Sequence, residues 1–404
     1  MAYTDDFMNT HQHSLTRSGY TIVGASFVIQ GTIVGAIFTY GVFFDALHGD
    51  LGWSRAVISA GSSLASLVMG VSAMIFGGLT DRIGPRRIMV GAGVLISLGY
   101  LVMSQLTAPW QLLLGYPILV GIAFGSHDVV TLSTVARWFD ARRGIMSAVV
   151  KAGTGLGQVV GPAVAALLIA AFGWRAAYAW IALGTGPVVI IAGRLMRQPP
   201  GVGEHYQSVP RDSRSPVLPV MKSRAFTLVA IAQSAVFFCT PIVIVHIVPY
   251  ATDIGLPRAV AAGILSLIGG VSIIGRLTVG VAIDKIGSRI SLLSCQLIML
   301  GSFVLLQFAT TAPLLYLFAV IYGFAHGGMF TAVSPLVAQL FGMHTHGQLY
   351  GTVIFLGTLT GALGPIMAGL VHDVTGNYQI AFLLPLLLLG VAATAIHTLR
   401  SVVP

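Results

Sequence analysis

Three charged side chains lie well inside segments that are otherwise apolar, and they are the strongest candidates for chemistry: Arg276, Asp128 and Lys151. The apolar run around Arg276 ends in a glycine-punctuated polar stretch near Ile283. At about 1.5 Å of rise per helical residue, each charge lies about 10 Å from the nearest polar boundary. A charge at such depth is costly and is usually retained for function. A fixed arginine facing a water-filled cavity would bind an anion.

Each of these charges also has a purely structural interpretation. Arg276 could extend to the membrane surface or pair with a carboxylate. Asp128 and Lys151 lie on consecutive predicted helices, and they could form a pair that only locks these helices together, because buried ion pairs need not be functional. We favour the functional interpretation of Arg276, since ionisable residues inside membrane segments mark substrate and ion pathways.

The elements that hold these charges predict an all-α polytopic membrane protein. Of the 404 residues, 56% are hydrophobic and 8% are charged, which is about a third of the charge of a soluble domain. Apolar runs long enough to cross a bilayer predict twelve transmembrane helices, at 19–44, 56–79, 88–106, 110–135, 144–172, 174–196, 225–250, 259–283, 290–309, 314–340, 347–371 and 378–399.

The basic residues are distributed unevenly between the two sides of the predicted membrane. Sixteen lie in loops on the side of the N-terminus, whereas only Arg55, Arg175 and Arg258 lie in the opposite loops. This asymmetry predicts that both termini are cytoplasmic, in the plasma or inner membrane of the cell. It also explains the net charge of +9, so we expect no nucleic-acid partner. The two cysteines lack metal-ligand spacing, and we expect no metal and no cofactor.

The chain repeats itself after 203 residues. Three separated regions share this offset: Gly77 to Arg86 with Gly280 to Arg289, Asp50 to Val57 with Asp253 to Val260, and Gly161-Pro162 with Gly364-Pro365. Six spans separate the copies, so the halves have the same orientation, a parallel repeat that places a substrate site between two rocking bundles. We predict bundles at 19–196 and 225–399, a cytoplasmic linker at 197–224, and cytoplasmic tails at 1–18 and 400–404.

With this repeat, the chain resembles the major facilitator superfamily over essentially its whole length. Gly77-x-Leu79-x-Asp81-Arg82-x-Gly84-x-Arg86-Arg87 resembles the loop signature between spans two and three, with Pro85 where a basic residue is more usual. Gly157 to Pro162 resembles the glycine-proline motif of span five. Four segments resemble the monocarboxylate transporters and the related oxalate–formate antiporters: Tyr40-Gly41-Val42-Phe43-Phe44, Gly52-Trp53-Ser54-Arg55, Trp138-Phe139-x-x-Arg142-Arg143-Gly144 and Gly275-Arg276.

The resemblance implies that Arg276 holds a substrate carboxylate, because it stands where the family has its span-eight arginine. A guanidinium matches a carboxylate through two parallel hydrogen bonds that lysine cannot reproduce. Ser272 stands where mammalian-type members have an aspartate, and the first-span region that ends at Tyr40 has no lysine. Gly347 to Val371 lacks the eleventh-span lysine of oxalate–formate antiporters, which disfavours a dianion unless Lys151 replaces it.

Movement of an anion with a proton requires a protonatable group. Asp253, at the outer end of span seven, is the first candidate and Asp128 the second. Asp253 could instead cap a helix, because it opens the same Asp-x-Gly-x-x-Arg pattern as its repeat partner Asp50. His246 and His326 are further candidates, since histidine titrates near physiological pH, although a lone histidine in a helix is more often a packing residue.

The other repeated residues are expected to act mechanically. Charges at the ends of spans two and eight can hold one access state closed, small residues allow close helix approach, and proline permits a bend. The gating candidates are Gly77, Asp81, Arg82, Gly84, Arg86, Gly280, Asp284, Lys285, Gly287, Arg289, Gly161 and Pro162.

Taken together, the residues and the resemblance predict a secondary carrier for small monocarboxylates such as lactate or pyruvate. It would move them with a proton by alternating access, act as a monomer, and use Tyr40 and His326 as further substrate ligands beside Arg276 and Lys151. The alternative is an exchanger for formate-like or oxalate-like anions, which needs no proton site. An enzyme is not expected, because no nucleophile and base constellation appears within the spans.

Overall fold

The computed structural model describes residues 2–200 and 217–399, which are helical apart from short connections. Eleven helical segments within these residues are long and apolar enough to cross a membrane. One of them contains two predicted spans, because Gly173 leaves helical geometry at a φ of 75° and divides the segment in two. All twelve predicted spans therefore lie in such segments, and the predicted all-α fold is confirmed.

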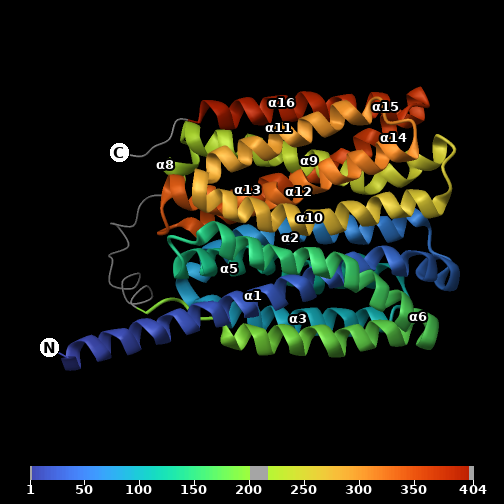
Figure 1. The fold of residues 1–404 in the computed structure, drawn as a ribbon. Helices are drawn as coiled ribbons and strands as arrows, with labels where there is room; N and C mark the ends of the chain where they lie inside the picture. The colour runs from blue at the N-terminus through green and yellow to red at the C-terminus, as the bar shows by residue number, and fades with distance from the viewer. Residues whose placement is uncertain (1, 201–216, 400–404) are drawn as a thin grey trace.

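The helices pack side by side and form one elongated bundle (Figure 1). Those of the first half are α1 (Ala2–Leu51), α2 (Arg55–Ile83), α3 (Pro85–Ser104), α4 (Pro109–Gly115), the π-helical η1 (Tyr116–Gly121), α5 (Ile122–Trp138) and α6 (Arg143–Leu195). Those of the second half are α9 (Arg224–Asp253), α10 (Arg258–Ile286), α11 (Ser288–Leu306), α12 (Ala312–Phe341), α13 (His346–Gly361), α14 (Leu363–Thr375), α15 (Tyr378–Ala381) and α16 (Leu383–Thr398).

Short α8 (Val217–Met221) lies between the two halves in the chain. Most of the predicted linker 197–224 and all of 400–404 lie outside the described residues. The first helix, α1, begins at one end of the bundle and α16 finishes at the same end (Figure 1). We call this end the terminal face and the opposite end the distal face.

The backbone repeats with the same spacing of 203 residues as the sequence. Six of the seven described residues with positive φ form three pairs at this spacing: Gly52 with Gly255, Gly84 with Gly287, and Gly173 with Gly376. Glycine adopts such φ values without the steric penalty of a Cβ. Equivalent helices of the two halves therefore end at equivalent points, which places the same sets of side chains at the same depth.

Two repeat-related helix crossings join the halves near the terminal face. Gly77 of α2 meets Gly347 of α13, and Gly280 of α10 meets Gly144 of α6. A Cβ at Gly77 would overlap the carbonyl oxygen of Gly347, and a Cβ at Gly144 would overlap that of Gly280. Gly61, nearer the distal face, contacts only its own half. The absence of side chains at the crossings brings the halves into backbone contact at the terminal end.

The repeated aspartates beside these crossings make different contacts. Asp284 accepts hydrogen bonds from two amides in the first turn of α6, Gly144 N at 2.6 Å and Ile145 N at 2.9 Å. It thereby joins the two halves and compensates the positive end of the α6 dipole. Its repeat partner Asp81 pairs with Arg137 of its own half.

The remaining gating candidates lie at the terminal face or within one half. Arg82 and Lys285 are exposed at the ends of α2 and α10. Gly161 packs against the backbone of Gly35 in α1, where a Cβ would overlap it, and α6 stays helical through Pro162. Gly161 and Pro162 thus belong to the packing of α1 on α6 and not to the contact between the halves.

Candidate substrate site

A cavity of about 240 Å³ lies between the two halves, and four of the predicted site residues line it: Asp128, Lys151, Arg276 and His326. Its walls come from α1, α2, α5 and α6 of the first half and from α9, α10, α12 and α13 of the second. The two glycine crossings lie about one to two turns nearer the terminal face than the cavity residues on the same helices, such as Ala73 and Ile354. The cavity is therefore closed toward that face.

Arg276 enters the cavity from α10 and is almost fully buried, with 1% of its surface exposed. Its Nη1 donates to Ser272 Oγ at 2.6 Å, whereas its Nε has no partner. No carboxylate in the described part of the chain forms an ion pair with it. Gly155 of α6 leaves room for the guanidinium, since a Cβ there would lie 2.7 Å from Nη1. A buried cation with open donors calls for an acceptor from a ligand or from water.

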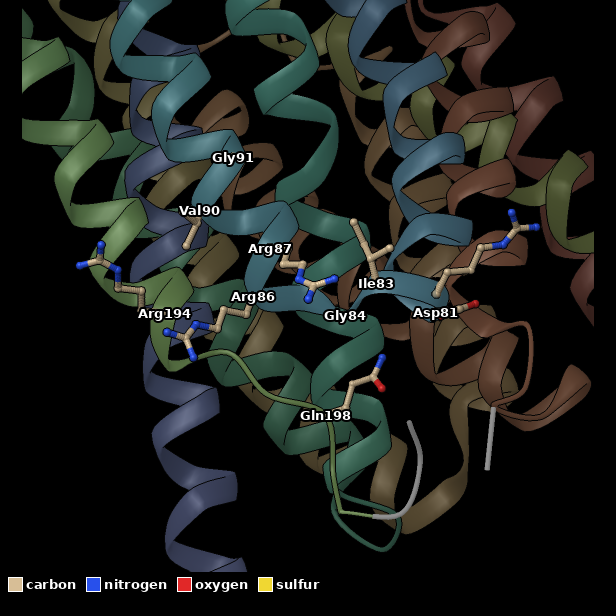
Figure 2. A pocket seen from close by; sticks show the side chains of 10 residues that line it. Asp81, Ile83, Gly84, Arg86, Arg87, Val90, Gly91, Arg194 and Gln198 are labelled. Carbon is tan, nitrogen blue, oxygen red and sulfur yellow. The ribbon is translucent and has the colours of Figure 1, made fainter. Parts of the chain in front are cut away.

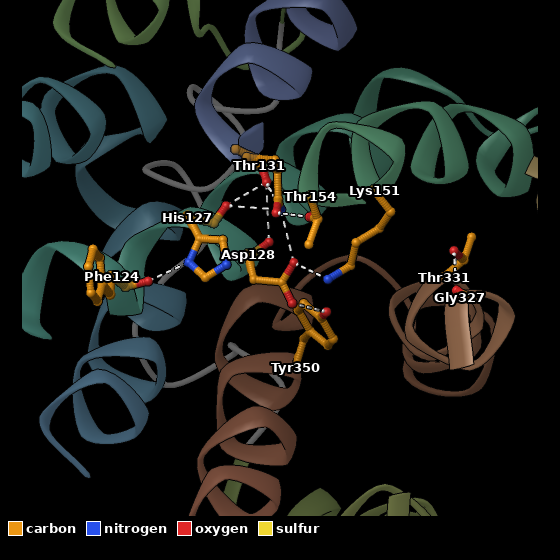
Figure 3. Close-up of polar contacts among 10 residues, drawn as sticks. Phe124, His127, Asp128, Thr131, Lys151, Thr154, Gly327, Thr331 and Tyr350 are labelled. Carbon is orange, nitrogen blue, oxygen red and sulfur yellow. Dashed lines mark hydrogen bonds and ion pairs between the residues drawn. The ribbon is translucent and has the colours of Figure 1, made fainter. Parts of the chain in front are cut away.

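Asp128 of α5 has a different environment, because its carboxylate is held from three sides (Figure 3). Lys151 Nζ of α6 lies 2.5 Å from Asp128 Oδ1, and Gln30 Nε2 of α1 donates to the same oxygen at 2.9 Å. Tyr350 of α13 donates its hydroxyl to Oδ2 at 2.8 Å. The charge of Lys151 is therefore compensated, and the bond from Tyr350 connects the two halves.

The uncharged members of this network were not among the predicted site residues. Thr154 Oγ1 donates to Gln30 Oε1 at 2.8 Å, which orients the amide toward Asp128. Gln30 could have been identified from the sequence as a member of a buried hydrogen-bond network. It is a lone amide in an apolar span, and buried polar groups need partners. Tyr350 offers no comparable signal, because tyrosine is common near the ends of spans.

His326 lines the cavity from α12 of the second half. Its ring stacks on Tyr322 with 5.8 Å between the ring centroids and meets Phe330 edge-on at 5.1 Å. Its Nδ1 is buried without a hydrogen-bond partner. Such a group can donate to or accept from a polar ligand, depending on its tautomer.

The other candidates lie away from the cavity. Tyr40 is buried in the first half, where its hydroxyl donates to the Ile58 carbonyl oxygen at 2.5 Å. His246 Nε2 lies 3.0 Å from the Pro365 carbonyl oxygen and Nδ1 lies 3.3 Å from the Tyr378 hydroxyl. A neutral ring that donates through Nε2 and accepts at Nδ1 satisfies both contacts.

Asp253 is the final residue of α9, at the distal face. Its side chain is 53% exposed and lies 3.5 Å from His372 Nε2. It makes no cap hydrogen bond to α10, whose N-cap is Pro257. The alternative that Asp253 caps a neighbouring helix therefore finds no support in the contacts of the described residues.

Metal binding finds no support in the same part of the chain. Within residues 2–200 and 217–399, no group of three or more His, Cys, Asp or Glu side chains could hold a metal ion. Both cysteines, Cys239 and Cys295, are buried and unpaired. Among the described residues that line the cavity, Arg276 is a buried cation without an ion-pair partner.

Two repeated halves around a buried cavity that contains charged side chains are the architecture of a secondary transporter. The profile of the Major Facilitator Superfamily matches residues 26–295 and 271–403, and the chain belongs to that superfamily. It is a multi-pass membrane transporter for a small solute, and it is not an enzyme. This confirms the superfamily that the loop and span-five motifs indicated.

Individual relatives are distant. Monocarboxylate transporter 12 of Mus musculus is 26% identical, over 85% of this chain and 76% of that protein. The uncharacterized MFS-type transporter YhjX of Escherichia coli (strain K12) is also 26% identical, over 85% of each chain. The crystal structure of the human organic anion transporter MFSD10 superposes with a TM-score of 0.72 at 18% identity, over 95% of this chain and 99% of that one. The structural likeness concerns the fold alone.

Proposed function

We propose that this transporter carries a small monocarboxylate together with a proton and that Arg276 binds the carboxylate. The principal support is the contrast between the two cations of the cavity. Lys151 is paired with Asp128, whereas Arg276 keeps open donors and has no anionic partner among the described residues. With Asp128 as a carboxylate, the three charges sum to one positive charge, which one monoanion neutralises.

The rest of the lining supports a short, partly apolar acid. Val34, Ile37, Phe38 and Phe330 line the same cavity as Arg276. Its volume of about 240 Å³ lies below the range of about 300–1,000 Å³ that is usual for ligand pockets. A lactate-like or pyruvate-like molecule would place its carboxylate on Arg276, its apolar end against these side chains, and its oxygen substituent toward His326 Nδ1.

The names of relatives agree with this proposal, since monocarboxylate transporter 12 of mouse is among them. The rival, an exchanger for oxalate-like dianions, would require a second open cation. Lys151 does not supply it while it is paired with Asp128 at 2.5 Å. With Asp128 ionised, the charge balance therefore favours the monocarboxylate.

For the proton we place Asp128 before Asp253, which reverses the order that the sequence favoured. Asp128 lines the cavity, contacts Lys151, and accepts a hydrogen bond from Tyr350 across the contact between the halves. Asp253 lies at the distal face and lines no described part of the cavity. A proton on Asp128 would free Lys151 and weaken the bond to Tyr350, so substrate binding and opening of the terminal face would both depend on one group.

The proposed cycle is alternating access. The crossings at Gly77 with Gly347 and at Gly280 with Gly144 would separate as the halves rock, and the cavity would then open to the terminal face. The asymmetric distribution of basic residues supports a cytoplasmic terminal face in the plasma or inner membrane, and the complete cavity within one chain supports a functional monomer. A cysteine at Ser213, outside the described residues, would then react with an impermeant thiol reagent only from the cytoplasm.

Uptake by purified protein in proteoliposomes tests the function. Labelled acids of one to five carbons would be offered with and without a pH gradient that is acidic outside the vesicles. We expect accumulation of a short monocarboxylate that depends on the gradient and is abolished by a protonophore. One-for-one exchange without any dependence on pH would instead establish the exchanger.

A further inference from the structure

A second cavity, of about 840 Å³, opens at the terminal face and is lined by four arginines: Arg82, Arg86, Arg87 and Arg194. It is built by the connection from α2 to α3, the first turns of α3, and the end of α6 (Figure 2). In Figure 2, Arg86 and Arg87 extend from the start of α3, Arg194 extends from the end of α6, and Gln198 lies on the connection that follows α6. The transport site uses none of these four side chains.

The positive charge of this cavity is not compensated by the described residues. Asp81 is the one carboxylate in the lining, and it pairs with Arg137, which lies outside the lining. None of the four arginines forms an ion pair or a side-chain hydrogen bond within the described part of the chain. Several like charges in one cavity repel each other, and an anion bound among them would relieve that repulsion.

The second half of the molecule shows how such an arginine can be satisfied internally. Arg289, the repeat partner of Arg86, donates through Nε to the Ile396 carbonyl oxygen at 3.0 Å and through Nη2 to the His397 carbonyl oxygen. It thus caps the end of α16. Arg86 makes no corresponding bond to the end of α6, and its donors remain available.

An apolar surface continues from the arginines toward the middle of the membrane. The helices α3 and α6 pack together, with Ser97 Oγ donating to the Ala182 carbonyl oxygen at 2.8 Å. Arg87, Gly91, Val94 and Leu98 follow one another at helical spacing on one face of α3, and Val94 and Leu98 are exposed. Gly91 lines the cavity, and a Cβ there would meet only open space, so it leaves a passage between the arginines and this surface.

The end of α6 contributes a matching surface. Ile191 and Leu195 lie three residues before and one residue after Arg194 on α6, and both are exposed. Exposed apolar side chains on a membrane-spanning helix face acyl chains. A cationic cavity at the membrane boundary, joined to an apolar surface on two helices, matches the two parts of a phospholipid, a phosphate and its fatty acids.

We propose that this cavity binds the phosphodiester of an anionic phospholipid and that the acyl chains lie along α3 and α6. The planar guanidinium groups of Arg86, Arg87 and Arg194 can each donate two hydrogen bonds to phosphate oxygens. Basic pockets between membrane helices bind the headgroups of such lipids. The site is independent of the identity of the transported solute.

Native mass spectrometry of the purified full chain in detergent tests this site, with phosphatidylglycerol and phosphatidylcholine of the same acyl composition as probes. We expect retention of phosphatidylglycerol by the wild type and at least tenfold weaker retention by the double variant Arg86→Gln, Arg87→Gln, given about 1 kcal/mol for each basic residue near an anionic surface. The variant Arg86→Lys, Arg87→Lys should keep much of the binding, because it retains the charge and differs only in geometry.

The matched control is the double variant Arg142→Gln, Arg224→Gln, which removes two exposed arginines from the same face outside this cavity. Arg194→Gln provides a second test if the first variant fails to fold. Equal retention by the Arg86 and Arg87 double variant and by the control would overturn the proposal. Equal retention of the two lipids, or displacement of phosphatidylglycerol by excess inorganic phosphate, would also overturn it, since the former shows no charge selection and the latter shows a site for free anions.

Discussion

The two halves of the molecule repeat their helices but not the charges of the cavity. Ala73 occupies the position equivalent to Arg276, and Ile354 the position equivalent to Lys151, and both apolar residues line the same cavity. Thr331 occupies the position equivalent to Asp128, and its hydroxyl donates within its own helix to the Gly327 carbonyl oxygen at 3.1 Å (Figure 3).

The glycines of the helix crossings, in contrast to the charges, are repeated in the two halves. Gly77 and Gly280 are repeat partners, as are Gly144 and Gly347, and each crossing joins a member of one pair to a member of the other. Each crossing brings the backbones of two helices into contact, so both helices need a glycine at that point. A single monoanion needs one open cation, and a second arginine at position 73 would add a charge that nothing compensates. The glycines of the crossings are therefore repeated in the two halves, whereas the charged residues of the cavity are not.

The largest effect is expected from Arg276→Lys. The charge remains but the bidentate geometry is lost, so the affinity for substrate should fall by roughly tenfold to a hundredfold, since a hydrogen bond to a charged group contributes about 1.5–3 kcal/mol. Equilibrium binding of the labelled acid to purified protein measures this change. Arg224→Lys, at an exposed position, is the matched control. Moving the cation with Ala73→Arg and Arg276→Ala should not restore binding, and wild-type affinity in Arg276→Lys would refute the carboxylate assignment.

Asp128→Asn should come next. We expect loss of accumulation driven by a pH gradient, while exchange of labelled for unlabelled substrate persists, because exchange avoids reorientation of the empty carrier. The double variant Asp128→Asn, Lys151→Gln restores the net charge of the cavity, so it should recover affinity without recovering the pH dependence. If the double variant accumulates substrate like the wild type, Asp128 and Lys151 form only a structural pair and the proton travels elsewhere.

Gly77→Ala and Gly78→Ala compare neighbouring positions that differ in contact. A Cβ at Gly77 would overlap the Gly347 carbonyl oxygen, whereas a Cβ at Gly78 would lie 3.7 Å from the side chain of Gln348. Overpacking costs about 1–3 kcal/mol, so Gly77→Ala should shift the equilibrium roughly tenfold toward opening at the terminal face. A cysteine at Thr358, in the cavity lining, reports this shift by its reaction rate with a thiol reagent applied to that face. Equal rates in the two variants would show that this crossing is not a gate.

Tyr350→Phe removes one hydrogen bond between the halves and leaves the ring in place. A net contribution of about 1 kcal/mol predicts that the terminal face opens about fivefold more often, measured with the same cysteine at Thr358. Tyr322→Phe is the control, because the Tyr322 hydroxyl donates to the Thr240 carbonyl oxygen within the second half, at 3.4 Å. A similar change in both variants would indicate a general loss of packing.

The smallest effects are expected at the repeat-related aspartates of the distal face. Asp50 Oδ2 accepts from Trp174 Nε1 at 2.9 Å, so Asp50→Asn should lower the free energy of unfolding by about 1 kcal/mol. Asp253→Asn should change proton-driven accumulation less than twofold, because its side chain is half exposed and outside the cavity. Thermal unfolding measures the first change and uptake under a pH gradient the second. Loss of accumulation in Asp253→Asn would instead indicate that Asp253 carries the proton.

Much of the fold could be predicted from local patterns. The apolar runs located the helices, because a chain in a bilayer must satisfy its backbone hydrogen bonds within each span. The spacing of 203 residues related the halves, and the glycines at Gly84 and Gly287 marked equivalent helix ends. The depth of Arg276, Asp128 and Lys151 in their spans indicated a common level, and all three line one cavity.

The partners of those charges could not be predicted in the same way. Gln30 and Tyr350 approach Asp128 from positions 98 and 222 residues away, and no local pattern encodes such contacts. The segment that resembles a transporter family also predicted that Tyr40 lies beside the substrate. In the structure, the Tyr40 hydroxyl donates to the Ile58 carbonyl oxygen instead. His246 was predicted as a proton carrier, but both of its ring nitrogens lie within hydrogen-bond distance of neighbouring groups.

The sequence by itself determined the membrane environment, the helices, the internal repeat and the superfamily. Each of these depends on composition or on short local motifs. Only the tertiary structure decided which of the two buried cations has an ion-pair partner among the described residues. That decision depends on the approach of α1, α6 and α13 to one carboxylate, which neutralises Lys151 and leaves Arg276 unpaired. Charge compensation acts over a few ångströms in space, and helix packing sets those distances.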